Sequence, residues 1–179
     1  MSALGSFFFV FLFLLRMTQG VHGSLAAWLL AAQSGLTAFR LIFRKKAKND
    51  SPLALQAMAW LSSLAPLAMV SLGSPLWEIP GLALSVWALL ALGDAFSISP
   101  SDRGLVQYGP YRFIRHPMYA GELLSVIGTC VSNPMFWNWS VLAIFVLSVY
   151  MRIVEEESVI EGYYSYTRVV AWRLIPHFW

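Results

Sequence analysis

The chain has little charge and almost no cysteine. Only 12% of its 179 residues are charged, compared with about 25% in an ordinary soluble domain. The single cysteine, Cys130, excludes a disulfide framework and a cysteine-based metal site, and we predict no metal site at all. The formal net charge of +3 is small, so we predict no nucleic-acid partner.

Hydrophobic residues make up 58% of the chain, more than a soluble protein of this size can bury. A membrane crossing takes roughly 20 apolar residues, and the chain has six apolar runs, of which the first and fifth are short. We therefore predict an all-α fold, a polytopic membrane helical bundle with five or six spans and a short cytosolic C-terminal helical tail. The runs lie at about 3–19, 24–43, 53–73, 77–93, 118–132 and 136–151.

The distribution of positive charge predicts the orientation. If the six runs alternate, three basic segments fall on one side of the membrane, which the positive-inside rule assigns to the cytosol. Both polar stretches, 101–122 and 152–179, then face the cytosol and together form one site. We find no internal repeat, so we predict one domain, 1–179, with N-terminal spans in 1–92 and a catalytic half in 93–179. The basic segments contain Arg44–Lys48; Arg103, Arg112 and Arg115; and Arg152, Arg168 and Arg173.

The first of these stretches contains the densest group of polar side chains, between Gly109 and Gly121. Proline is favoured at the first position of a helix, so we expect His116 at a helix boundary and Pro117 at the start of the fifth run. Tyr119 and Glu122 are three residues apart and share one face of that helix. Glu122 is an ionisable group inside an apolar run, which makes it a functional candidate.

The second polar stretch begins with three adjacent carboxylates, Glu155 to Glu157. They occupy different faces of a helix, so one or two can face a buried pocket, where a carboxylate suits an ammonium group or ribose hydroxyls. A simpler interpretation is also open. Arginines of the first stretch can bind lipid phosphates, and a run of charge often begins a solvated helix. On that view the protein is non-catalytic and its polar face only anchors it.

Taken together, the two stretches resemble a known superfamily of enzymes. The pattern Gly109-Pro-Tyr-x-x-x-Arg-His-Pro-x-Tyr-x-Gly121 is followed, after one apolar hairpin, by Glu-Glu, Tyr-x-x-Tyr and Arg-x-Ile-Pro. This order resembles the isoprenylcysteine carboxyl methyltransferase and phospholipid methyltransferase superfamily, over about residues 93 to 179. The resemblance implies a multi-span membrane enzyme that uses S-adenosylmethionine as its methyl donor.

The resemblance also implies roles for individual residues. It places Glu155 and Glu156 as the paired carboxylates of the cofactor site, with Glu157 as the alternative in a one-residue shift. It places Arg173 and Tyr166 toward the methyl acceptor. The remaining residues expected to line the cofactor pocket are Tyr111, Arg115, His116, Pro117, Tyr119 and Gly121.

The methyl acceptor stays open at this point. We expect a lipophilic small molecule or a lipid, with membrane lipids as neighbours, and the sequence does not predict an oligomeric state. A carboxylate acceptor needs no base, whereas an amine or a thiol needs one, with His116 or Glu122 as candidates. The segment between the carboxylates and Tyr163 is shorter than in the family. The ending from Trp172 to Trp179 also resembles membrane sterol reductases, so an NADPH-dependent reductase is the alternative.

Overall fold

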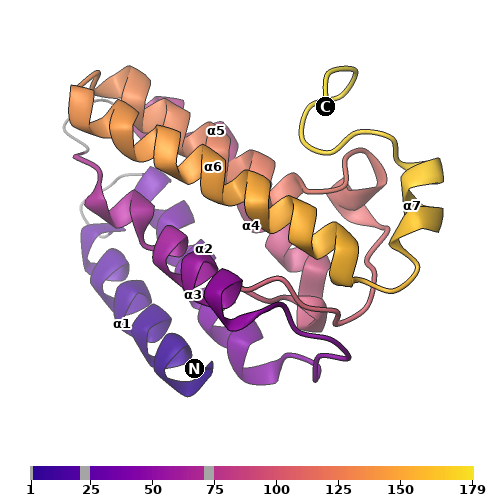
Figure 1. Cartoon of the computed structure of the whole chain (residues 1–179). Coiled ribbons are helices and arrows are strands. Elements are labelled where there is room, and N and C mark those ends of the chain that lie inside the picture. Colours follow the sequence, from indigo (N-terminus) through magenta and orange to yellow (C-terminus); the bar gives the residue numbers. More distant parts are fainter. Residues whose placement is uncertain (1, 21–24, 71–74) are drawn as a thin grey trace.

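The computed structural model describes residues 2–20, 25–70 and 75–179, and within these ranges the chain forms helices and no strand (Figure 1). The predicted all-α class is therefore confirmed. The α-helices are α1 (Ser2–Gly20), α2 (Leu25–Phe43), α3 (Leu53–Ser63), α4 (Ile79–Leu92), α5 (Pro117–Ser132), α6 (Phe136–Val159) and α7 (Tyr163–Val169).

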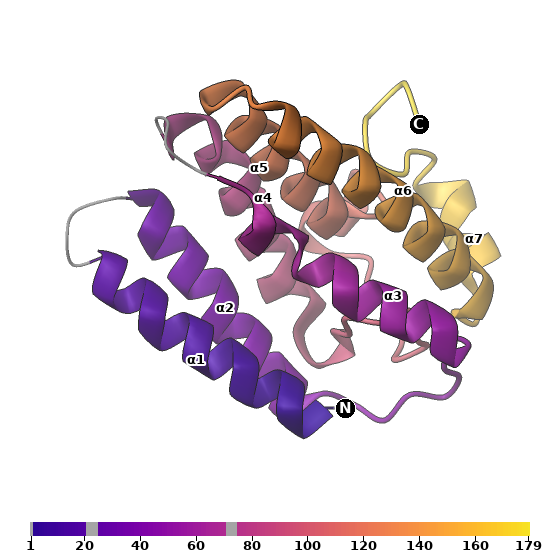
Figure 2. The same cartoon turned by 60° about the vertical axis from the view of Figure 1, so that its left-hand side comes forward.

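The helices form two groups that lie against each other. α1 and α2 run antiparallel along their whole length, while α4 packs on α5 and α5 on α6 (Figures 1 and 2). α2 also contacts α4, and α3 lies along α6, so the hairpin of α1 and α2 closes one side of the α4–α6 group. α7 and the C-terminal segment lie at one end of α6, near the start of α5 (Figure 1).

Four of the six predicted runs coincide closely with helices, and the third does not. The run at 53–73 was expected to be one span, but α3 ends at Ser63 and is followed by a 3₁₀ turn over Ala65–Ala68. Pro66 explains the break, because proline cannot continue the hydrogen bonding of an α-helix. At 1.5 Å per residue, α3 is roughly 16 Å long, too short to cross a hydrocarbon core. Residues 71–73 of that run lie outside the described residues.

The sixth run is longer than expected. α6 continues to Val159, eight residues beyond the predicted end of the span, so Arg152 and the three glutamates lie on its last turns. By length and composition, α2 and α6 can each cross a membrane, and the shorter apolar helical segments are Gly5–Thr18, within α1, and Ile79–Ala95, which begins with α4. The number of spans therefore stays a prediction.

Small residues let α4 and α5 approach closely. A Cβ atom built on Gly121 of α5 would lie 2.6 Å from the backbone nitrogen of Ser85 and 2.7 Å from the carbonyl oxygen of Gly81, both on α4. A Cβ on Gly81 would lie 2.3 Å from the backbone nitrogen of Ser125. Such contacts between small residues are typical of helix packing in membranes, where close backbone approach supplies the van der Waals energy. They fix the position of the start of α5, which carries the Arg-His-Pro motif.

At the opposite end of the bundle, Asn138 ties α6 to the segment that follows α3. Its side chain is fully buried, accepts a hydrogen bond from the Val70 backbone nitrogen (3.0 Å) and donates to the Val70 (2.9 Å) and Asn133 (3.0 Å) carbonyl oxygens. One amide therefore satisfies backbone groups that have no helical partner.

Replacing Asn138 by alanine is expected to destabilise the protein by about 2 kcal/mol, because the half-buried Val70 N–H and Asn133 carbonyl oxygen lose their bonds to the amide, while the Val70 carbonyl oxygen keeps the one from Asn133 Nδ2. Denaturant unfolding of the protein in lipid nanodiscs measures this loss. The control is Ser140→Ala on the same helix, whose hydroxyl bonds only to its own helix and whose removal should change stability by less than about 0.5 kcal/mol. Equal effects of the two substitutions would contradict the role given to Asn138.

Candidate functional site

The Arg-His-Pro motif lies where the sequence predicts it, at the start of α5. His116 is the N-cap residue and Pro117 the first helical residue, which confirms the expected boundary. The backbone nitrogens of Arg115 and His116 donate to the carbonyl oxygens of Trp172 (2.8 Å) and Arg173 (2.9 Å). The C-terminal segment therefore lies directly on the motif.

Glu157, near the end of α6, is the centre of a cluster of ion pairs that we call the Glu157 cluster. The Arg173 guanidinium donates to both carboxylate oxygens, at 2.9 and 2.7 Å, and Arg115 lies 3.1 Å from one of them. His116 Nε2 lies 3.2 Å from the same oxygen and 2.9 Å from the Tyr163 hydroxyl. The Glu157 side chain is only 13% exposed. Charge-assisted and bidentate bonds of this kind are the strong ones, so the cluster fixes the geometry of this end of the bundle.

A second group of contacts lies beside the Glu157 cluster. The Tyr119 hydroxyl donates to a carboxylate oxygen of Glu156 at 2.8 Å. The Arg152 guanidinium lies over the Tyr119 ring, 4.6 Å from its centroid, and donates to the Ile98 carbonyl oxygen at 2.8 Å. Tyr119 and Arg152 are 3% and 2% exposed. Arg152 and Glu156 are one turn apart on α6, so they hold the Tyr119 ring between opposite charges.

Some residues of both groups line a cavity that we call the tyrosine cavity. Burial raises the pKa of Tyr166 to about 12, and burial, with the charge of Glu157 as the next cause, raises the pKa of Tyr163 further. Both phenols are therefore neutral near physiological pH and donate hydrogen bonds, Tyr166 to the carbonyl oxygen of Tyr111. The polar and aromatic side chains of its lining are Ser97, Ser99, Ser101, Tyr111, Arg115, His116, Tyr119, Glu156, Tyr163 and Tyr166.

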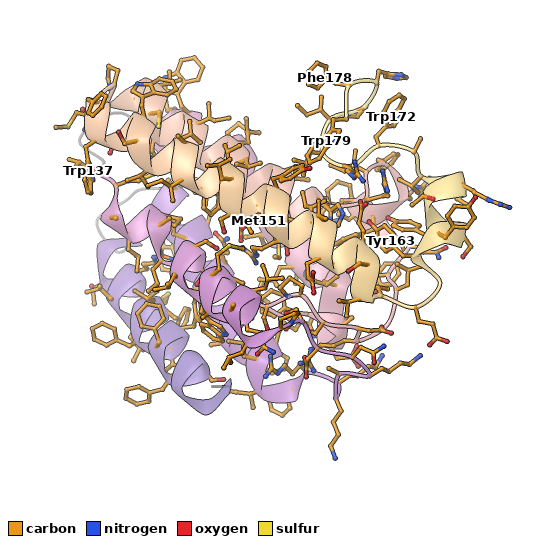
Figure 3. All side chains as sticks on the ribbon, viewed as in Figure 1. Trp137, Met151, Tyr163, Trp172, Phe178 and Trp179 are labelled. Carbon is orange, nitrogen blue, oxygen red and sulfur yellow. The ribbon has the colours of Figure 1, made fainter. Side chains whose placement is uncertain are left out.

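The C-terminal segment covers the outside of this region. Tyr163 lies next to the end of α6, and Trp172 and Trp179 lie in the segment that follows α7 (Figure 3). The Trp179 ring stacks on Tyr150 of α6, with 6.0 Å between ring centroids, and Arg173 lies over the same indole. The stacking holds Arg173 in reach of Glu157.

A second cavity lies between the α1–α2 hairpin and the α4–α6 group, and we call it the hairpin cavity. Met118 lines both cavities, so they lie on either side of this residue in the first turn of α5. The hairpin cavity is mostly apolar, with a small set of polar side chains. These are Arg16, Gln33, Ser34, Thr37, Ser63, Ser85, Glu122, Ser125 and Arg152.

The structure brings together most of the residues expected at the cofactor site. Tyr111, Arg115, His116, Tyr119 and Glu156 all line the tyrosine cavity. Pro117 is buried in the first turn of α5, and Gly121 packs against the backbone of α4 instead of lining a cavity. Of the paired carboxylates, Glu156 lines the cavity and Glu157 binds its neighbours, whereas Glu155 lines neither cavity as the described residues define them.

The residues expected at the acceptor lie apart from one another. Glu122 lines the hairpin cavity, Tyr166 lines the tyrosine cavity, and Arg173 is held by Glu157. Sequence reasoning gave no site role to Arg152, to Tyr163 or to the serines at 97–101. For Arg152 a signal was present, since it is an ionisable residue four positions before Glu156 on one helix.

Over the described residues the protein is all-helical, it has apolar helices, and a carboxylate of α6 contacts the Arg-His-Pro turn. These features match the class of membrane methyltransferases named by the resemblance. The sequence model of the family described as phospholipid methyltransferase matches residues 67–167, more than half of the chain. The chain belongs to this family. The match starts before residue 93, where the resemblance was expected to begin, and stops before Arg173. No curated protein matches the chain.

Proposed function

We propose that this protein transfers a methyl group from S-adenosylmethionine to a lipophilic acceptor in the membrane, of the lipid or isoprenylcysteine carboxylate type. The observation that carries the proposal is the Glu156 carboxylate, held by Tyr119 in the tyrosine cavity beside the Arg-His-Pro turn. A sulfonium donor is a cation, and a carboxylate with aromatic rings is the environment that suits one.

The residues of the tyrosine cavity fit this donor. The Ser97 hydroxyl and Arg115 Nε are buried, and neither has a hydrogen-bond partner among the described residues. Buried polar groups are normally paired, so both are open to a polar ligand, Ser97 to ribose or amino acid groups and Arg115 to a carboxylate. Tyr119 and Tyr163 give the cavity an aromatic lining, and Glu156 offers the charge opposite to that of the donor.

S-adenosylmethionine, when bound, supplies an activated methyl group. The chain's own residues then have three tasks. The buried tyrosines exclude water from the donor, and the Glu157 cluster fixes the C-terminal segment over the cavity. Glu122 in the hairpin cavity is placed to take a proton from an amine or thiol acceptor, whereas His116 is occupied by Glu157 and Tyr163. Arg173, bound to Glu157, acts as a positioning residue.

We further propose that five or six segments of the bundle cross the membrane. The Arg-His-Pro turn and the end of α6 then lie on the cytosolic side. The excess of lysine and arginine around these segments supports this orientation. Water-soluble donor then enters from the cytosol, and the acceptor enters laterally from the lipid.

Calorimetric titration of the purified protein with S-adenosylmethionine and with NADPH tests the donor. We expect binding of S-adenosylmethionine and none of NADPH. Glu156→Ala should weaken donor affinity by at least about tenfold, or about 1.4 kcal/mol, with the helical content unchanged. Glu155→Ala is the matched control and should retain the affinity. Binding of NADPH alone would replace the proposal with a reductase, and binding of neither would remove both enzymes.

A further inference from the structure

We propose that the hairpin cavity binds an anionic oxygen of the acceptor's head group on Arg152, and that α2 determines which head groups fit. This inference rests on the proposed function, since it names the acceptor site of that reaction. It concerns residues to which neither the family match nor the sequence motifs gave a role.

The hydrogen bonding of Arg152 is incomplete. The side chain is buried within an apolar bundle, where a guanidinium needs hydrogen-bond acceptors for its donors as well as opposite charge nearby. One nitrogen donates to the Ile98 carbonyl oxygen, but Nε is buried and has no partner among the described residues. An unsatisfied buried donor costs about 1–3 kcal/mol. Because Arg152 lines the hairpin cavity, an oxygen of a molecule in that cavity is a suitable partner.

A single unpaired donor in the lining of the hairpin cavity favours an anionic oxygen. Arg16 and Arg152 are both in its lining, with Glu122 as the carboxylate. Arg16 is already engaged, because it donates to the Leu30 carbonyl oxygen and to the Ser34 hydroxyl. The charges of Glu122 and Glu156 both act on Arg152, so the preference for an anionic oxygen comes from the Arg152 Nε donor, which has no partner among the described residues, and not from an excess of positive charge. A carboxylate or a phosphate ester supplies the matching oxygen.

The wall opposite Arg152 comes from α2. Gln33, Ser34 and Thr37 line the cavity from this helix, and all three precede residue 67, where the family match begins. The motif-bearing part of the lining thus lies within the family match, and these three residues of α2 lie outside it. A few polar groups in a mostly apolar pocket are what fix the orientation of a ligand and its specificity.

The hairpin cavity is also in the right place for transfer. It shares Met118 in its lining with the tyrosine cavity, and Tyr119 contacts both sides, with Arg152 on its ring face and Glu156 on its hydroxyl. A head group on Arg152 and a donor on Glu156 are therefore separated by the first turn of α5.

Photo-crosslinking of the full-length protein in nanodiscs tests the inference. The probes are diazirine derivatives of a fatty acid, a lysophosphatidate and a fatty amine, with the adducts mapped by mass spectrometry. We expect at least one anionic probe to label residues lining the hairpin cavity at least about tenfold more than the amine does. A preference between carboxylate and phosphate identifies the head group. Equal labelling of these residues by the anionic probes and by the amine would overturn the proposal.

Two substitutions on α2 make the test specific for the cavity. Thr37→Trp fills the cavity and should abolish labelling by the anionic probe, whereas Phe39→Trp, at a position that is 50% exposed on the same helix, should not. Arg152→Met should lower the labelling about tenfold and Arg152→Lys should restore part of it. Unchanged labelling of Thr37→Trp would contradict the assignment.

Donor titration of the same samples separates the two proposals. Thr37→Trp should bind S-adenosylmethionine with the affinity of the unmodified protein, because Thr37 does not line the tyrosine cavity. If the donor binds and the anionic and amine probes label the cavity equally, only the role of Arg152 is overturned. Charge-selective labelling without donor binding would overturn the proposed reaction and leave an anionic lipid site.

Discussion

Replacing Glu157 by alanine is expected to destabilise the protein by about 3–5 kcal/mol, the cost of removing one partner from a buried ion pair. The carboxylate balances Arg115, whose side chain is only 9% exposed, and binds Arg173 through two hydrogen bonds. Without it, Arg115 is a buried cation that has lost its carboxylate partner, and the C-terminal segment keeps the stacking of Trp179 on Tyr150 but loses its ion pair with α6. Donor affinity should fall as well, because Arg115 and His116 line the tyrosine cavity.

Denaturant unfolding in nanodiscs measures the loss of stability, and calorimetric titration measures the loss of donor affinity. Glu155→Ala is the matched control, since it removes the same group two positions earlier on the same helix and should cost less than about 0.5 kcal/mol. Similar effects at the two positions would mean that α6 is rotated relative to the arrangement described above.

Replacing Gly121 by alanine should cost about 3 kcal/mol, at the upper end of overpacking substitutions. The intrinsic preference of a helix favours alanine over glycine by about 1 kcal/mol, so a loss has to come from packing. The added Cβ would lie under 3 Å from backbone atoms of Gly81 and Ser85, and these atoms cannot move without separating α4 from α5. Because α5 carries Tyr119, the shift should also weaken donor binding.

The same unfolding measurement tests this prediction, with Ala83→Val on the exposed face of α4 as the control. The control should change stability by less than about 0.5 kcal/mol. A Gly121→Ala protein that is as stable as the unmodified one would show that the two helices lie further apart.

The sequence was sufficient for the features that depend on local patterns. Apolar runs located the helices, and the proline at 117 located the start of α5 with His116 as its cap. The order of the motifs indicated the superfamily, and the family match confirms it. These predictions hold because a helix boundary and a motif are properties of neighbouring residues.

Features that depend on helix phase and packing were not accessible in the same way. Successive residues on a helix point about 100° apart, so three adjacent glutamates fit a buried face in more than one way, and only the packing of α6 selects Glu156 and Glu157. Gly121 was expected to line a cofactor pocket, but its close approach is to α4. Arg152 counted only as a positive charge near the membrane until the structure placed it on Tyr119.

Methyl transfer into lipid is the most direct test of the proposed reaction. Nanodiscs prepared from native membrane lipid and containing the purified protein would be incubated with S-adenosylmethionine labelled in its methyl group, and the lipid extract counted. We predict label in the extract, reduced at least about tenfold by Glu156→Ala and unaffected by Glu155→Ala. Label that never exceeds the level of protein-free nanodiscs, while the donor still binds, would contradict a lipid acceptor.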